Sequence, residues 1–106
     1  MNTQTLEALK ASIAKWERNA EAKTPNEYLT SDIDCPLCNL FIRDGCKGCP
    51  VFERTGELFC RDTPYRTAGP AWFDWTDLET SEHRDRAHAA ACDEVAFLKS
   101  LLPVQP

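Results

Sequence analysis

Five cysteines within residues 35–60 constrain this chain more than any other feature of its sequence. They form two C-x2-C pairs followed by one further cysteine. A C-x2-C spacing lets both sulfurs of a tight turn face one ion while backbone amides hydrogen-bond the thiolates. Tetrahedral zinc takes four ligands, so two pairs in one short segment predict a tetrathiolate metal site. The candidate ligands are Cys35, Cys38, Cys46, Cys49 and Cys60.

The fifth cysteine leaves the choice of four ligands open. The segments 51–54 and 57–60 are typical of the two arms of a β-hairpin around Thr55-Gly56, because both arms are apolar and the turn contains glycine. With a two-residue loop, Val51 faces Cys60, which returns Cys60 to the second C-x2-C pair. The ligands are therefore either the four cysteines of the two pairs, or a set in which Cys60 replaces one of the second pair.

All-sulfur ligation suits zinc or iron, because soft thiolates exclude the hard cations. We expect Zn2+, which commonly binds knuckle pairs with Pro and Gly around them. The alternative is an iron-sulfur cluster, since Cys49-Pro50 resembles the Cys-Pro that ends bacterial ferredoxin motifs, although the ferredoxin C-x2-C-x2-C run is absent.

The cysteine pattern also resembles known families of small metal proteins. Cys35 to Cys38 looks like the second knuckle of rubredoxins, with Asn39 in place of the usual glycine. More broadly, the pattern resembles the zinc-ribbon and zinc-knuckle modules of small bacterial and phage proteins, over about a quarter of the chain. This resemblance implies that the cysteines bind metal, and it implies no further site residue.

Two amphipathic helices are expected to flank the cysteine segment. The first runs from Thr3 or Thr5 to about Ala22, and the second from Thr80 or Ser81 to Leu102. The expected apolar stripes are Leu6, Leu9, Ile13, Trp16 and Ala20 in the first helix, and Ala87, Ala91, Val95, Leu98 and Leu102 in the second. The predicted fold is thus a single domain, residues 1–106, that is mainly α. It comprises an N-terminal helix (1–24), a cysteine-rich metal module with a short β-hairpin (35–67) and a C-terminal helix (80–102).

Three other groups of residues have some features of a functional site. The run from Cys60 to Thr67 fits C-x5-R-[ST] and resembles the phosphate loop of cysteine phosphatases, but Pro64 removes an amide such a loop uses, so we interpret it as a turn. His88 and Cys92 stand four apart on the second helix, and we expect Cys92 to be a small buried side chain. Trp72 and Trp75 are expected to cover the core, or else to anchor a partner.

Charge and composition limit the functions that are open to the chain. The formal net charge is −5, which counts against nonspecific nucleic-acid binding. The sequence shows no signal peptide and no apolar run long enough to span a membrane, so we expect a cytoplasmic protein that does not contact membranes. A metal ion with four sulfur ligands has no open coordination position for water or substrate, so we do not expect the protein to be an enzyme.

The resulting hypothesis is a zinc-stabilised interaction or regulatory protein. It would bind another protein through its acidic helical face or through the Trp72/Trp75 segment. The first alternative is an iron-sulfur or other redox protein. The second is a nucleic-acid-binding zinc module that uses basic side chains between aromatic ones. Those basic residues are Arg43, Lys47, Arg54, Arg61 and Arg66.

Overall fold

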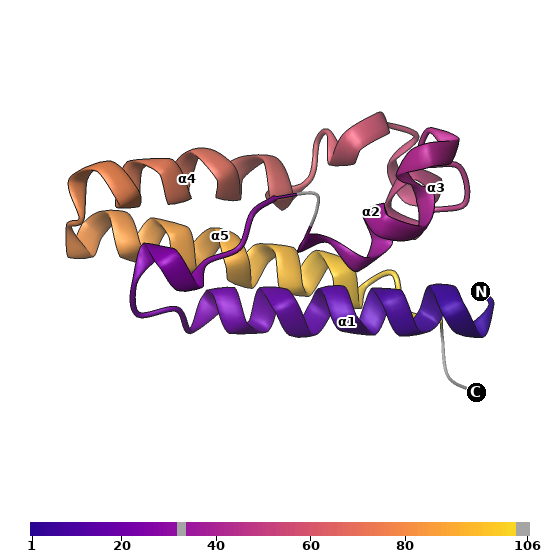
Figure 1. Cartoon of the computed structure of the whole chain (residues 1–106), viewed down its shortest axis with the longest axis horizontal. Coiled ribbons are helices and arrows are strands. Elements are labelled where there is room, and N and C mark those ends of the chain that lie inside the picture. The colour runs from indigo at the N-terminus through magenta and orange to yellow at the C-terminus, as the bar shows by residue number, and fades with distance from the viewer. Residues whose placement is uncertain (32–33, 104–106) are drawn as a thin grey trace.

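Three long helices lie side by side in the computed structural model, which describes residues 1–31 and 34–103 (Figure 1). They are α1 (Thr3–Ala20), α4 (Pro64–Leu78) and α5 (Ser81–Lys99). Helix α5 packs against both α1 and α4 and therefore forms the centre of the layer. The cysteine segment lies at the end of this layer where α1 begins and α5 ends (Figure 1). It contains the short helices α2 (Pro36–Phe41) and α3 (Pro50–Thr55), and the 3-10 turns η3 (Ile42–Asp44) and η4 (Leu58–Cys60).

Helix α1 forms where the apolar spacing predicts it. Asn2 caps its first turn, since the Asn2 Oδ1 accepts a hydrogen bond from the backbone N–H of Thr5 at 2.7 Å. Leu9, Ile13 and Trp16 are buried against α5 and the cysteine segment, as expected. The buried face is wider than the apolar stripe, however, because it also includes four polar residues. These are Thr5, Ser12, Lys15 and Asn19.

Helix α5 packs closely because small side chains cover its buried face. Thr80 caps the helix by accepting the N–H of His83 at 3.2 Å. Ala87, Ala90 and Ala91 are at most 3% exposed, so the neighbouring helices approach the α5 backbone. Cys92, which the sequence places in the interior, is exposed instead. That expectation is wrong because Cys92 lies just outside the buried arc of α5.

The predicted β-hairpin at residues 51–60 is wrong. The chain is all-helical in residues 1–31 and 34–103, and α3 occupies the first expected arm. Pro50 starts α3 at a position where its missing N–H costs nothing, and Gly56 ends it in the left-handed region at φ 72°. The Thr55-Gly56 pair is thus a helix C-cap rather than a hairpin turn. The second expected arm contains η4 in place of a strand.

Helix α4 lies in the connection before the C-terminal helix, where the sequence pattern predicts no helix, and it has Pro70 in its interior. The structure accommodates Pro70 on an exposed side of the helix, while Trp75 is buried on the other. The ring of Tyr28 packs edge-on against Trp16 and Trp75, at centroid distances of 5.9 and 6.2 Å. The Tyr28 hydroxyl donates to the Ala87 carbonyl oxygen at 2.7 Å. This aromatic group therefore joins α1, α4 and α5 across the middle of the layer.

Within the described residues, no helix has the length and apolar character that crossing a membrane requires.

Candidate metal centre

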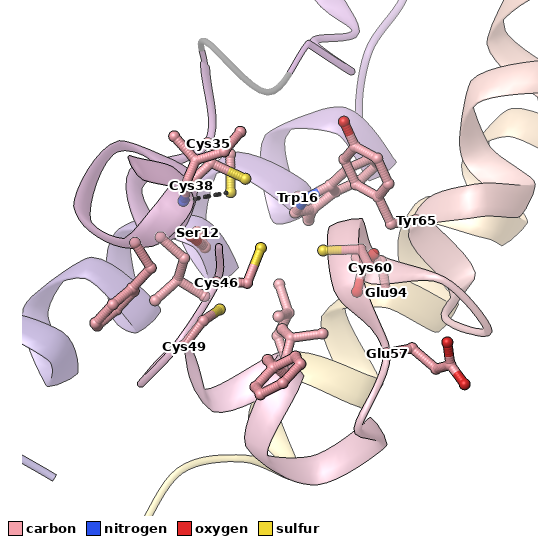
Figure 2. Close-up of a pocket in the computed structure, with 16 residues that line it drawn as sticks. Ser12, Trp16, Cys35, Cys38, Cys46, Cys49, Glu57, Cys60, Tyr65 and Glu94 are labelled. Carbon is pink, nitrogen blue, oxygen red and sulfur yellow. Dashed lines mark hydrogen bonds between the residues drawn. The ribbon is translucent and has the colours of Figure 1, made fainter. Parts of the chain in front are cut away.

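All five cysteines of the predicted site line one cavity between α1, α5 and the cysteine segment (Figure 2). The cavity has a volume of about 30 Å³. A water molecule needs roughly 10–15 Å³ by the same measure, so the space suits one or two small ions rather than a substrate. Cys35, Cys46 and Cys49 are buried, whereas Cys38 and Cys60 are half-buried. The sequence pattern therefore identified a set of side chains that the fold brings together.

The first pair is positioned by the start of α2. Cys35 is the N-cap residue of this helix, and Pro36 occupies the first helical position. The Cys35 Sγ accepts the backbone N–H of Cys38 at 3.4 Å, shown as a dashed line in Figure 2. This is the contact by which a C-x2-C turn stabilises a thiolate.

The second pair is positioned by a sharp turn followed by α3. Gly45 and Cys46 both adopt positive φ angles, 65° and 67°. A left-handed conformation costs a non-glycine residue about 1–2 kcal/mol, so the surrounding structure must hold Cys46 in place. The Cys46 N–H bonds the Phe41 carbonyl oxygen at 3.0 Å, and Cys49 then becomes the N-cap residue of α3. The chain thus turns back so that both sulfurs face the cavity.

The fifth cysteine reaches the cavity without a hairpin. Cys60 is the last residue of η4 and has a φ angle of 60°, again in the left-handed region. Its sulfur points toward the sulfurs of the two pairs in Figure 2. Helix α3 ends at Gly56, and the 3-10 turn that follows returns Cys60 to the site without the pairing of two strands that the sequence predicted.

The electrostatics of the cavity favour one thiolate. Hydrogen bonding from the Cys38 thiol, together with the Cys38 backbone N–H and the Lys15 ammonium, lowers the pKa of Cys35 to about 6. The same hydrogen bond raises the pKa of Cys38. Burial raises the pKa of Cys49, and it raises the pKa of Cys60 to about 12. Only a cation in the cavity would allow several of these thiols to ionise together.

Three buried polar side chains beside the cysteines were not predicted from the sequence. Ser12 and Glu94 line the cavity, and Lys15 interacts electrostatically with Cys35 and Cys38. Lys15 and Glu94 are each 3% exposed, and burial lowers the pKa of Lys15 and raises that of Glu94 to about 7. The Ser12 hydroxyl, the Lys15 Nζ and the Glu94 Oε2 have no hydrogen-bond partner among the residues that the structure describes. Lys15 and Glu94 each stand directly beside a position of an apolar stripe in the sequence, and this position could have indicated that they are buried.

The sulfur and carboxylate donors around the cavity do not converge on a single point. In the described ranges, 1–31 and 34–103, no three His, Cys, Asp or Glu side chains are arranged closely enough to hold one metal ion. Four sulfurs at about 2.3 Å from a tetrahedral zinc lie roughly 3.8 Å from one another. Binding one ion by four of these sulfurs would therefore require their side chains to rotate toward the centre of the cavity.

The other candidate sites do not assemble. His88 bonds the Ala22 carbonyl oxygen through Nε2 at 2.6 Å and packs against Trp75, while Cys92 is exposed, so they form no nucleophilic pair. The phosphatase-like run is divided: Cys60 ends η4, and Arg66 is an exposed residue in the first turns of α4.

Comparison with known proteins adds no relative: no protein-family model, curated protein or solved structure matches this chain.

Proposed function

We propose that the cysteine segment binds zinc through thiolates and that the metal has a structural role. The observation that supports this is the convergence of five cysteines, from both C-x2-C pairs and from η4, on one small cavity. Cysteines that serve only as small buried side chains have no reason to converge on one cavity. Thiolates at a closed site suit zinc, and four sulfur ligands leave no position for water or substrate. We therefore propose a zinc-stabilised interaction or regulatory protein rather than an enzyme.

The test is elemental analysis of protein purified without added metal and under exclusion of oxygen. Zinc bound to the chain, with no visible absorbance, is the expected result. Serine replacements within the cysteine segment should lower the zinc content, whereas Cys92→Ser should not, because Cys92 is exposed and lies outside the cavity. Full zinc content after replacement of all five cavity cysteines would refute the proposal.

An iron-sulfur cluster is the second candidate, and one observation favours it. The five cysteines surround a space, and no three donors in the described part of the chain are close enough to share one ion. A cluster fills such a space, because its iron and sulfide core keeps the protein thiolates apart. If the same preparation contains iron and acid-labile sulfide and has a broad visible absorbance, the site binds an iron-sulfur cluster rather than zinc.

The partner surface that we propose is the acidic face formed by the end of α4 and the start of α5. Its exposed acidic residues are Asp74, Asp77, Glu79, Glu82 and Asp85. The exposed apolar side chains of Phe73 and Leu78 lie on the same part of α4. Trp75 is buried and Trp72 donates its indole N–H to the Pro25 carbonyl oxygen at 2.9 Å, so neither is free to serve as the anchor.

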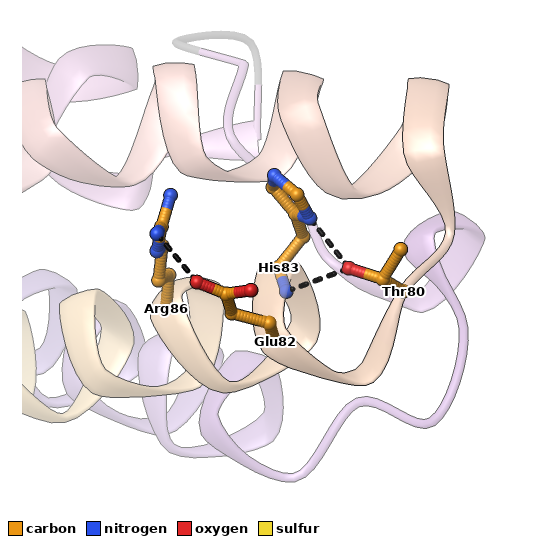
Figure 3. A network of polar contacts seen from close by, with 4 residues as sticks. All are labelled: Thr80, Glu82, His83 and Arg86. Atoms are coloured by element: carbon orange, nitrogen blue, oxygen red, sulfur yellow. Dashed lines mark hydrogen bonds and ion pairs between the residues drawn. The ribbon is translucent and has the colours of Figure 1, made fainter.

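Part of this acidic face is paired within the chain. Glu82 accepts a hydrogen bond from Arg86 at 2.7 Å, and Thr80 and His83 bond each other beside them (Figure 3). The remaining charge would select a basic partner. Binding of a lysine-rich model peptide should fall with rising salt and should weaken in a variant carrying Asp74→Asn and Asp77→Asn. Equal binding by the variant and the original chain would refute this surface.

A further inference from the structure

The cavity contains one more metal donor than the cysteines alone provide. Glu94 extends from α5 into the wall of the cavity, and Figure 2 shows its carboxylate beside Cys60. The residue is 3% exposed, and its Oε2 has no hydrogen-bond partner in the part of the chain that the structure describes. A buried carboxylate without a cation or sufficient donors is strongly destabilising. The Glu94 carboxylate accepts the backbone N–H of Tyr65 and interacts electrostatically with Lys15, but its Oε2 stays without a hydrogen bond. The position of this oxygen among five thiols points to a metal cation as its further partner.

The number of donors does not fit a single ion. Glu57 also lines the cavity, but its carboxylate points away from the sulfurs in Figure 2. The five thiols and the Glu94 carboxylate therefore give six donors, while a tetrahedral zinc uses four. One zinc would leave two donors without a ligand role in a cavity whose walls are mostly apolar. Two zinc ions need eight coordination positions, and six donors fill eight positions when two thiolates bridge both ions. The volume of about 30 Å³ is roughly twice that required by one water-sized particle.

We propose that this cavity holds two zinc ions, with Glu94 as the sixth protein donor and two of the cysteine thiolates bridging the ions. This inference rests on the proposed zinc function and specifies the centre. Five thiolates, one carboxylate and two divalent ions give a net charge of −2. The buried ammonium of Lys15, on the adjacent turn of α1, offsets part of that charge. The two buried ionic side chains beside the cavity, Lys15 and Glu94, thereby both acquire a role at the metal centre.

The experiment counts zinc ions per chain by native mass spectrometry, in the presence of a chelator that removes weakly held surface zinc. We expect two ions for the original chain. Glu94→Gln keeps the size of the side chain but removes its charge, and should leave one tightly held ion, with the second bound at least tenfold more weakly. Glu57→Gln is the matched control, because Glu57 also lines the cavity but its carboxylate points away from the sulfurs in Figure 2.

The metal-free proteins provide a second readout. A purely structural Glu94 would make Glu94→Gln less stable without metal. A metal donor should leave the metal-free melting temperature nearly unchanged, since glutamine is of the same size and can still accept the Tyr65 N–H. One zinc in the original chain, unaltered by Glu94→Gln, would overturn the two-ion centre and leave the proposed function intact. No zinc in any variant would instead overturn the proposed function itself.

Discussion

If the cysteines hold zinc as proposed, removing the metal should unfold the cysteine segment and leave the three long helices folded. The reason lies in how the buried apolar side chains are distributed. The long helices and the loop after α1 share a core that includes Leu9, Trp16, Tyr28 and Trp75. Apart from its cysteines, the only fully buried residues among the described side chains of segment 36–60 are Leu37, Pro50 and Val51, while Leu40, Phe41 and Phe52 are partly buried. Its order should therefore depend on what the cysteines bind.

The magnitudes support this division. Burial of Leu37 and Val51 contributes about 1.5–3 kcal/mol each, whereas a structural zinc contributes about 10–16 kcal/mol at neutral pH. If the cysteines bind zinc as proposed, metal binding would thus be the largest single contribution to ordering the segment. Helices α2 and α3 have six residues each, against 18, 15 and 19 in α1, α4 and α5. Loss of both short helices would remove 12 of 64 α-helical residues, or about a fifth of the circular dichroism signal at 222 nm.

The assay is circular dichroism during chelation, combined with amide hydrogen exchange. We expect the helical signal to fall by about a fifth, with protection lost in the cysteine segment and kept in α1, α4 and α5. Readdition of zinc should restore both. Chelation that changes neither quantity would refute the reasoning, since the segment would then be ordered by its own contacts. Collapse of the entire helical signal would also refute it, because the long helices would not form an independent core.

Three further variants test individual contacts. Lys15→Met should weaken zinc binding about tenfold in a competition titration, because a buried positive charge near the thiolates is removed, while exposed Lys10→Met should not change it. Tyr28→Phe removes the hydrogen bond to the Ala87 carbonyl and should lower the free energy of urea unfolding by about 1 kcal/mol, with zinc content unchanged. An unaltered unfolding midpoint would show that this hydrogen bond adds no stability. Gly56→Ala forces alanine to φ 72° and should cost about 1–2 kcal/mol in the same assay; no loss would mean that the C-cap of α3 relaxes.

The candidate site was more predictable than the path of the chain that forms it. The cysteine pattern identified the five cysteines that line the cavity, because C-x2-C turns are local features. The hairpin was wrong because residues 51–60 are apolar at spacings compatible with either a strand or a short helix. Pro50 at a first helical position and Gly56 in a left-handed cap decide for the helix.

The sequence by itself determined α1 and α5, because their apolar spacing recurs over many turns and their caps are adjacent in the chain. Only the tertiary structure decided which polar side chains accompany the cysteines. Lys15 and Glu94 lie on different helices and 79 positions apart, and each would be ordinary on an exposed helix face. Packing of α1 against α5 buries both beside the thiols, and this burial makes a lysine and a glutamate candidates for the metal centre.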